Sequence, residues 1–263
     1  ISRPELNVWV ITGDGDALSI GGNHLIHAMR RNIDLKILLF NNRIYGLTKG
    51  QYSPTSEVGK RSPSTPLGSV DNPFNPLSLA LGAGASFVAR AVDTDTRHLQ
   101  EVLRSAAAHR GTAFVEIYQN CNVFNDDAFV HFTDKQVRPD RQLLLEQGKP
   151  LLFGKDRDRG IRLSKEGVPL VVEVGDGEGR VSVAELPVHD PSLPNPSYAF
   201  MLSQLDYPDY PVPVGVLRAV EAPVYDSALR AQEEVARTRT PNHEDLTTLW
   251  KMGDTWEVGP SQA

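Results

Sequence analysis

Two polar motifs, each directly after an apolar run, carry residue types that bind a phosphate and a metal ion. Gly13-Asp14-Gly15-Asp16 follows residues 6–12, and Asn41-Asn42 follows residues 35–40. Glycines let the backbone approach a phosphate and point N–H groups at it, and carboxylate and amide oxygens suit Mg²⁺. The two motifs at this spacing predict a Mg²⁺–diphosphate site. Taken alone, Gly-Asp-Gly is also consistent with a tight turn, and Asn-Asn with the end of a strand.

The elements around these motifs predict where they lie. The two apolar runs read as strands, and residues 23–31 between them read as a helix, which makes a βαβ unit with parallel strands. The alternation continues with a helix over 76–81, a strand over 85–92, a helix over 96–110 and a strand over 112–118. The sequence therefore predicts an α/β fold with a doubly wound, mostly parallel sheet, whose strand carboxyl ends carry both motifs.

Other segments depart from this alternation. Residues 48–76 hold several prolines and no periodicity, which predicts a long loop. Residues 168–174 and 180–184, joined by the glycine-rich turn 175–179, predict a β-hairpin. This change in sequence pattern divides the chain into an α/β domain over 1–150 and a C-terminal extension over 151–263. The extension is predicted to contain the hairpin and short helices.

Composition excludes several classes of protein. The 263 residues carry 27 basic and 33 acidic side chains, a net charge of −6, which argues against a nucleic-acid-binding surface over the whole chain. No apolar run approaches the roughly 18 residues of a membrane-spanning helix. A single cysteine excludes an internal disulfide framework, and its simplest interpretation is a small buried side chain. The chain opens on Ile1 shortly before a strand, so we expect it to be a piece of a longer protein.

The two motifs resemble a known signature. Gly-Asp-Gly followed at this distance by Asn-Asn is similar to the signature of thiamine diphosphate (TPP) enzymes. The surrounding residues 13–24, 41–51 and Ser53-Pro54-Thr55 resemble the β subunits of 2-oxoacid:ferredoxin oxidoreductases, most closely those of the 2-oxoglutarate type. The resemblance covers most of residues 1–150 and, more loosely, the extension.

The resemblance implies roles for particular residues. Asp14, the Asn42 side chain and the Ile44 carbonyl are expected to bind Mg²⁺. The expected TPP-binding residues are these three with Gly13, Gly15, Asp16, Leu47 and Thr48. Gly15 and Asp16 are expected to hold the diphosphate through backbone N–H groups.

The resemblance also implies a reaction and partners. Family enzymes cleave a 2-oxoacid such as 2-oxoglutarate with TPP, release CO₂, pass electrons to ferredoxin and leave the acyl group on coenzyme A. Cys121 is expected to be one ligand of a [4Fe–4S] cluster, whose other ligands lie upstream in a Cys-x-x-Cys segment that these residues lack. An α subunit is expected to complete the site, so the chain alone is expected to be inactive. Such clusters place the enzyme in the cytoplasm.

Two residues next to this site keep alternative interpretations. Lys49 follows Thr48 and is placed to meet the distal carboxylate of a dicarboxylic oxoacid or a CoA phosphate. It reads equally well as a solvated loop lysine. Leu47 is either a wall beside the substrate or ordinary packing.

Two other functions compete with this interpretation. A non-redox TPP-dependent decarboxylase or synthase shares the two motifs, but it usually continues Gly-Asp-Gly with a Phe/Met pattern where this chain has Ile20-Gly21-Gly22. A non-catalytic nucleotide-phosphate binding module is the other competitor. Nothing after Gly15 supports it, because the chain has neither a Gly-x-Gly-x-x-Gly motif nor a Walker lysine.

Overall fold

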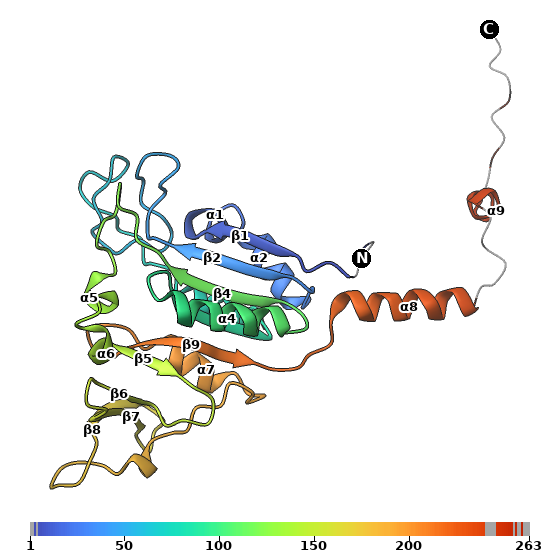
Figure 1. Cartoon of the computed structure of the whole chain (residues 1–263). Coiled ribbons are helices and arrows are strands. Elements are labelled where there is room, and N and C mark those ends of the chain that lie inside the picture. The colour runs from blue at the N-terminus through green and yellow to red at the C-terminus, as the bar shows by residue number, and fades with distance from the viewer. Residues whose placement is uncertain (1–2, 4, 240–245, 255, 257–258, 260–263) are drawn as a thin grey trace.

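The predicted apolar runs form four neighbouring strands of one six-stranded sheet (Figure 1). The structure is a computed structural model that describes residues 3, 5–239, 246–254, 256 and 259. The strands are β1 (Trp9–Gly13), β2 (Lys36–Asn41), β3 (Phe87–Val92), β4 (Ala113–Tyr118), β5 (Gln142–Leu145) and β9 (Val212–Ala219). Their order is β1-β2-β4-β3-β9-β5. The first four run parallel, β9 is antiparallel to β3, and β5 is parallel to β9. The predicted mostly parallel α/β sheet is confirmed.

Helices cover both faces of this sheet. The helices α1 (Asp14–Leu18), α2 (Gly22–Arg30), α3 (Pro76–Gly82) and α7 (Ser197–Ser203) pack on one face. The helix α4 (Thr96–Ala108) packs on the other. Because successive strand residues point to opposite faces, Leu39 and Phe114 enter the first core, and Leu38 and Val115 enter the second. This double burial explains why β2, β3 and β4 are nearly continuous apolar runs.

The residues at the two ends of α4 account for where the helix begins and stops. The Asp95 side chain accepts a hydrogen bond from the backbone N–H of His98 and is the N-cap of the helix. The helix stops at Ala108, slightly earlier than predicted, because His109 is already extended. Gly111, with a φ of +107°, then turns the chain into β4.

The predicted hairpin of residues 168–174 with 180–184 is wrong. The strand β8 (Pro169–Glu173) pairs instead with β7 (Arg159–Leu163), which also pairs with β6 (Leu152–Phe153), in a small antiparallel sheet. The turn between β7 and β8 is closed by Ser164, whose N–H donates to the Val168 carbonyl at 2.8 Å. Ser182 and Glu185 form a capping box that starts a 3₁₀ helix, η1 (Val183–Glu185), so the segment after the glycines cannot extend as a strand.

The remaining elements are α5 (Val130–Thr133), α6 (Arg138–Arg141), α8 (Tyr225–Arg239) and α9 (Leu246–Trp250). Helix α8 begins beyond the amino ends of the parallel strands and runs away from the sheet without a buried residue (Figure 1). Strand β9 belongs to residues 151–263 but completes the sheet of residues 1–150, so the two parts of the chain share one sheet. Among the described residues, no helix has the length and apolarity needed to cross a bilayer.

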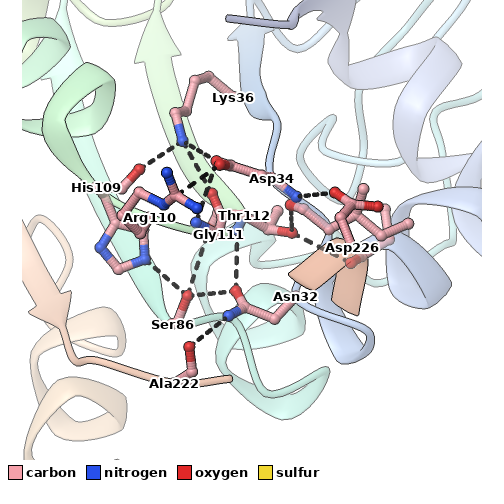
Figure 2. A network of polar contacts seen from close by, with 12 residues as sticks. Asn32, Asp34, Lys36, Ser86, His109, Arg110, Gly111, Thr112, Ala222 and Asp226 are labelled. Carbon is pink, nitrogen blue, oxygen red and sulfur yellow. Dashed lines mark hydrogen bonds and ion pairs between the residues drawn. The ribbon is translucent and has the colours of Figure 1, made fainter. Parts of the chain in front are cut away.

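A polar assembly ties the amino ends of the strands to the segment that leads into α8 (Figure 2). We call it the amino-end network; its members are Asn32, Asp34, Lys36, Ser86, His109, Gly111 and Thr112. The Asn32 side chain accepts from the Thr112 N–H at 2.9 Å and donates to the carbonyls of Ala222 and Pro223. This network fixes the end of the sheet that lies opposite the two sequence motifs.

Candidate functional site

Asp14 is the buried centre of the predicted site. It is the first residue of α1, directly after β1, and only 1% of it is exposed. Its Oδ2 atom accepts hydrogen bonds from Ser53 Oγ and Thr55 Oγ1, each at 2.6 Å. Within the part of the chain that the structure describes, no cation pairs with this carboxylate, and burial raises its pKa. A dry carboxylate without a positive partner is suited to bind a divalent cation.

The loop after β2 brings the other predicted metal ligands to Asp14. The Asn42 N–H lies 3.5 Å from Asp14 Oδ1, and Asn42 Oδ1 accepts from the Ile44 N–H at 3.2 Å. Arg43 adopts a left-handed φ of +57°, which reverses the chain between Asn42 and Ile44. The Asn42 backbone thus lies beside Asp14, and a carboxylate, an amide oxygen and a backbone carbonyl are a donor set that fits Mg²⁺. The roles of Asn42 and Ile44 as metal ligands stay predictions.

Gly15 sits under a tyrosine. The Tyr45 hydroxyl donates to the Gly15 carbonyl at 2.6 Å, and a Cβ on Gly15 would lie 2.4 Å from the Tyr45 ring. Only glycine fits here, so the second glycine of the motif is required by packing as well as by any ligand. Asp16 is exposed, and its carboxylate accepts from Thr12 Oγ1 at 3.0 Å. Gly13 is the N-cap of α1 and has open space around it.

A cavity of about 920 Å³ opens beside these residues. Its lining includes Leu18, Tyr45, Thr48, Ser53 and Phe74. Ser53 connects the cavity to Asp14. Its side chain lines the cavity, and its hydroxyl donates to the Asp14 carboxylate. A second cavity, of about 500 Å³ at the ends of β3 and β4, contains none of the predicted site residues.

Three predicted residues lie apart from the buried donors. Leu47 is 98% exposed, Lys49 is exposed with a φ of +74°, and neither lines the larger cavity. Cys121 is half-buried beside the same loop, where a Cβ on Gly46 would lie 3.8 Å from its Sγ atom. Their expected roles therefore stay predictions.

Behind Asp14 a chain of buried polar groups runs into the sheet. Thr55 Oγ1 lies 3.0 Å from Asn41 Oδ1, and Asn41 Nδ2 donates to Glu116 Oε1 at 2.8 Å. Glu116 in turn accepts from Arg90 Nε at 2.7 Å. Arg90 Nη1 is buried without a hydrogen-bond partner among the described residues. We call this set the carboxyl-end cluster; its members are Asp14, Asn41, Ser53, Thr55, Arg90 and Glu116.

Sequence reasoning assigned no role to four members of this cluster. Ser53 and Thr55 come from the long loop, where nothing in the pattern indicates which hydroxyl points inward. Arg90 and Glu116 left a usable signal. Each is the one charged residue in a strand that is otherwise apolar and predicted to be buried on both faces. Opposite charges in two such strands indicate a buried ion pair.

Comparison with known proteins defines the class first. A family model described as the C-terminal TPP binding domain of thiamine pyrophosphate enzymes matches residues 1–117. These residues contain Asp14, the loop after β2 and the lining of the larger cavity. The four parallel strands β1 to β4, up to Ile117, and the buried cluster thus lie in the part of the chain that matches a TPP-enzyme domain.

Longer similarities define the family. The chain is 51% identical over 261 residues to 2-oxoglutarate oxidoreductase subunit KorB of Mycobacterium tuberculosis, covering 98% of this chain and 68% of that protein. It is 42% identical over 137 residues to the 2-oxoacid:ferredoxin oxidoreductase subunit beta of Saccharolobus solfataricus, 52% of this chain and 45% of that subunit. The chain belongs to the β-subunit family of the 2-oxoacid:ferredoxin oxidoreductases, and it is therefore part of an oxidoreductase.

A solved structure agrees with this assignment. The 2-oxoglutarate:ferredoxin oxidoreductase from Magnetococcus marinus, with 2-oxoglutarate, coenzyme A and succinyl-CoA bound, has a TM-score of 0.67 and 31% sequence identity. The match covers 97% of this chain and 70% of that chain. The similarity therefore extends through the C-terminal extension as well as the TPP domain.

Proposed function

We propose that the chain binds TPP and Mg²⁺ and serves in the oxidative decarboxylation of 2-oxoglutarate with coenzyme A to succinyl-CoA, CO₂ and reduced ferredoxin. Family membership supports the reaction class. The names of the M. tuberculosis relative and of the M. marinus structure support 2-oxoglutarate and coenzyme A as substrates.

The observation that carries this proposal is the dry, unpaired carboxylate of Asp14. Asp14, Asn42 and the Ile44 carbonyl would hold Mg²⁺, and the backbone around Gly15 and Thr48 would face the diphosphate across the cavity. TPP, when bound, supplies the carbanion chemistry that a 2-oxoacid needs to lose CO₂. The protein's part is to orient the cofactor and to neutralise the diphosphate charge.

Partners follow from the same family. We propose an α subunit that completes the site, because the cavity beside Asp14 is open and its neighbour Leu47 is 98% exposed. We also propose ferredoxin as electron acceptor and a [4Fe–4S] cluster with Cys121 as one ligand. The half-buried thiol lies against the Gly46 backbone, on the loop that also carries Thr48. A reduced cysteine and such a cluster suit the cytoplasm.

Lys49 and Leu47 remain candidates for substrate recognition. In the assembled enzyme, Lys49→Ala is expected to weaken the use of 2-oxoglutarate more than that of pyruvate, which has no distal carboxylate. Lys165→Ala is the matched control, because it removes an exposed lysine that lies outside the proposed site. Equal losses for both oxoacids in Lys49→Ala would remove the charge-recognition role.

The decisive experiment is calorimetric titration with TPP, with and without Mg²⁺, of the protein and of Asp14→Ala. We expect Mg²⁺-dependent binding that the substitution abolishes. The titration is repeated with the α subunit present, since that subunit is expected to close the site. Binding by neither preparation, or unchanged Mg²⁺-dependent binding by folded Asp14→Ala, would overturn the proposed function.

A further inference from the structure

The two oxygens of the Asp14 carboxylate have different surroundings. Oδ2 accepts from Ser53 Oγ and Thr55 Oγ1 at 2.6 Å each, whereas the one hydrogen bond that the described residues make to Oδ1 comes from the Asn42 N–H, at the long distance of 3.5 Å. Ser53 and Thr55 are 2% and 4% exposed, so water does not compete for these bonds. Among the described residues, the carboxylate is thus held mainly through Oδ2, and Oδ1 has a single weak contact.

The single hydroxyl hydrogen of Thr55 has three acceptors within reach. Asp14 Oδ2 lies at 2.6 Å, Asn41 Oδ1 at 3.0 Å and Ser53 Oγ, whose own hydrogen bond goes to Asp14, at 3.1 Å. The carboxylate is the closer and stronger acceptor, and Asn41 Oδ1 already accepts from the Arg43 N–H at 3.2 Å. The Thr55 hydrogen therefore goes to Asp14.

The orientation of Asn41 is set from behind. Glu116 can only accept, so Asn41 must turn its Nδ2 atom toward Glu116 Oε1 and its Oδ1 atom toward Thr55. Glu116 is fully buried and held by Arg90 Nε at 2.7 Å. The buried ion pair thereby orients the amide of Asn41, the residue directly before Asn42.

We propose that Ser53 and Thr55 are positioning residues that occupy Oδ2 of Asp14 and so leave Oδ1, on the Asn42 side, as the one atom with which Asp14 binds its cation. This inference rests on the proposed function. One-oxygen binding suits Mg²⁺, which requires near-octahedral geometry, whereas Ca²⁺ also accepts both oxygens of a carboxylate. The two hydroxyls therefore help to select Mg²⁺ over Ca²⁺.

The test is calorimetric titration of the assembled enzyme with TPP in the presence of Mg²⁺ or of Ca²⁺. Thr55→Val keeps the shape of the side chain and removes the hydroxyl. We expect it to weaken Mg²⁺-supported binding about tenfold, the scale of one lost charge-assisted hydrogen bond, and to change Ca²⁺-supported binding much less. Thr55→Ser restores the hydroxyl and is expected to restore the wild-type preference for Mg²⁺.

Thr112→Val is the matched control. Thr112, directly before β4, is also a buried threonine, and its hydroxyl donates to the Ile33 carbonyl at 2.6 Å in the amino-end network. A purely structural role for buried hydroxyls predicts the same result for both variants. We expect Thr112→Val to leave the Mg²⁺/Ca²⁺ ratio unchanged.

The outcomes separate this inference from the proposed function. Metal-supported TPP binding by Asp14→Ala would overturn the metal site itself. Loss of binding in Asp14→Ala together with an unchanged Mg²⁺/Ca²⁺ ratio in Thr55→Val would overturn only the positioning role. If Thr55→Val does not fold, Ser53→Ala applies the same test to the other hydroxyl, and an unchanged ratio there overturns the inference equally.

Discussion

The carboxyl-end cluster and the amino-end network occupy opposite ends of the same parallel strands, and they solve the burial of polar groups in different ways. In the amino-end network, the ammonium of Lys36 meets Asp34 Oδ1 at 2.9 Å and the carbonyls of His109 and Gly111 at 2.6 and 3.0 Å. Every lysine N–H has an acceptor. This end of the sheet is complete without a ligand.

The carboxyl-end cluster is incomplete at both of its ends. Asp14 is a buried carboxylate without a cation, and Arg90 Nη1 is a buried donor without an acceptor among the described residues. Proteins seldom leave such groups unpaired unless the site has another task. The contrast indicates that polar residues at the amino ends stabilise the fold, whereas those at the carboxyl ends prepare a binding site at some expense of stability.

The largest expected effect is a loss of stability on substitution of Glu116. It tests whether the carboxyl-end cluster lowers the stability of the fold. Glu116→Leu leaves the buried Arg90 charge unpaired, so we expect it to lower the free energy of unfolding by about 3–5 kcal/mol. Glu116→Leu combined with Arg90→Met replaces the ion pair with apolar contacts and is expected to recover most of this loss. Urea unfolding measures both. A double variant as unstable as the single one would show that the pair exists for stability.

The same double variant sharpens the comparison further. Asn41 loses its acceptor when Glu116 is replaced, so TPP affinity should fall even where stability returns. Calorimetric titration of the double variant measures this separation. Full stability with full affinity would contradict a role of the ion pair in preparing the site.

Lys36→Met is the corresponding change at the amino ends. It strips three acceptors of their partner, two of them main-chain carbonyls, and we expect a loss of about 2–4 kcal/mol in the free energy of unfolding. The affinity of the folded protein for TPP should not change, since the residue lies at the far end of the sheet. Lys165→Met, at an exposed turn position, is the control and should be neutral. Weaker TPP binding by folded Lys36→Met would break the division between the two ends.

Asn32→Ala should have a smaller effect, which is followed in the segment that leads to α8. The Asn32 amide donates to the carbonyls of Ala222 and Pro223, and its loss is expected to cost about 1–3 kcal/mol. Hydrogen exchange of residues 219–226 should accelerate. Because Asn32 has a φ of +50°, Asn32→Gly is the matched variant that separates backbone strain from the lost side-chain bonds. Unchanged exchange in both variants would show that this segment is held by other contacts.

The smallest expected effect is a pH dependence from the amino-end network. Burial, assisted by the charge of Lys36, lowers the pKa of His109 to about 4, whereas an unfolded histidine titrates near pH 6.5. The unfolded chain therefore binds more protons between these values, and stability falls as the pH drops from about 6.5 to about 4. His109→Gln should flatten this part of the curve, measured by thermal unfolding at several pH values. His24→Gln, which removes an exposed imidazole, is the control, and a larger flattening there would contradict the assignment.

Local pattern was sufficient to predict the parts of the fold that local burial determines. The strands β2, β3 and β4 are buried on both faces, so their apolar runs were visible in sequence, and the helix predicted over 96–110 is α4. Because parallel strands end at one edge, the proximity of Asp14 and Asn42 followed as well.

Features that depend on contacts between residues far apart in sequence could not be predicted from local pattern. The partner of β8 was predicted wrongly because two turns competed, and a capping box at Ser182, rather than apolar pattern, decided between them. The inward direction of Ser53 and Thr55 depends on contacts with Asp14 and Asn41 that lie far away in sequence. The Arg90–Glu116 pair was within reach, since each charge interrupts an apolar strand.

The position of β9 between β3 and β5 has a consequence for synthesis of the chain. Arg90 in β3 lies opposite Gly215 in β9, so during translation the edge of β3 stays unpaired until almost the whole described chain has been made. At roughly 5–20 residues per second, the nascent chain presents that edge for on the order of ten seconds. Exposed strand edges invite pairing with other chains. A fragment that ends at residue 150 keeps this edge permanently open, and we expect it to aggregate or to need a chaperone, whereas a chain extending through Ala219 can close its own sheet.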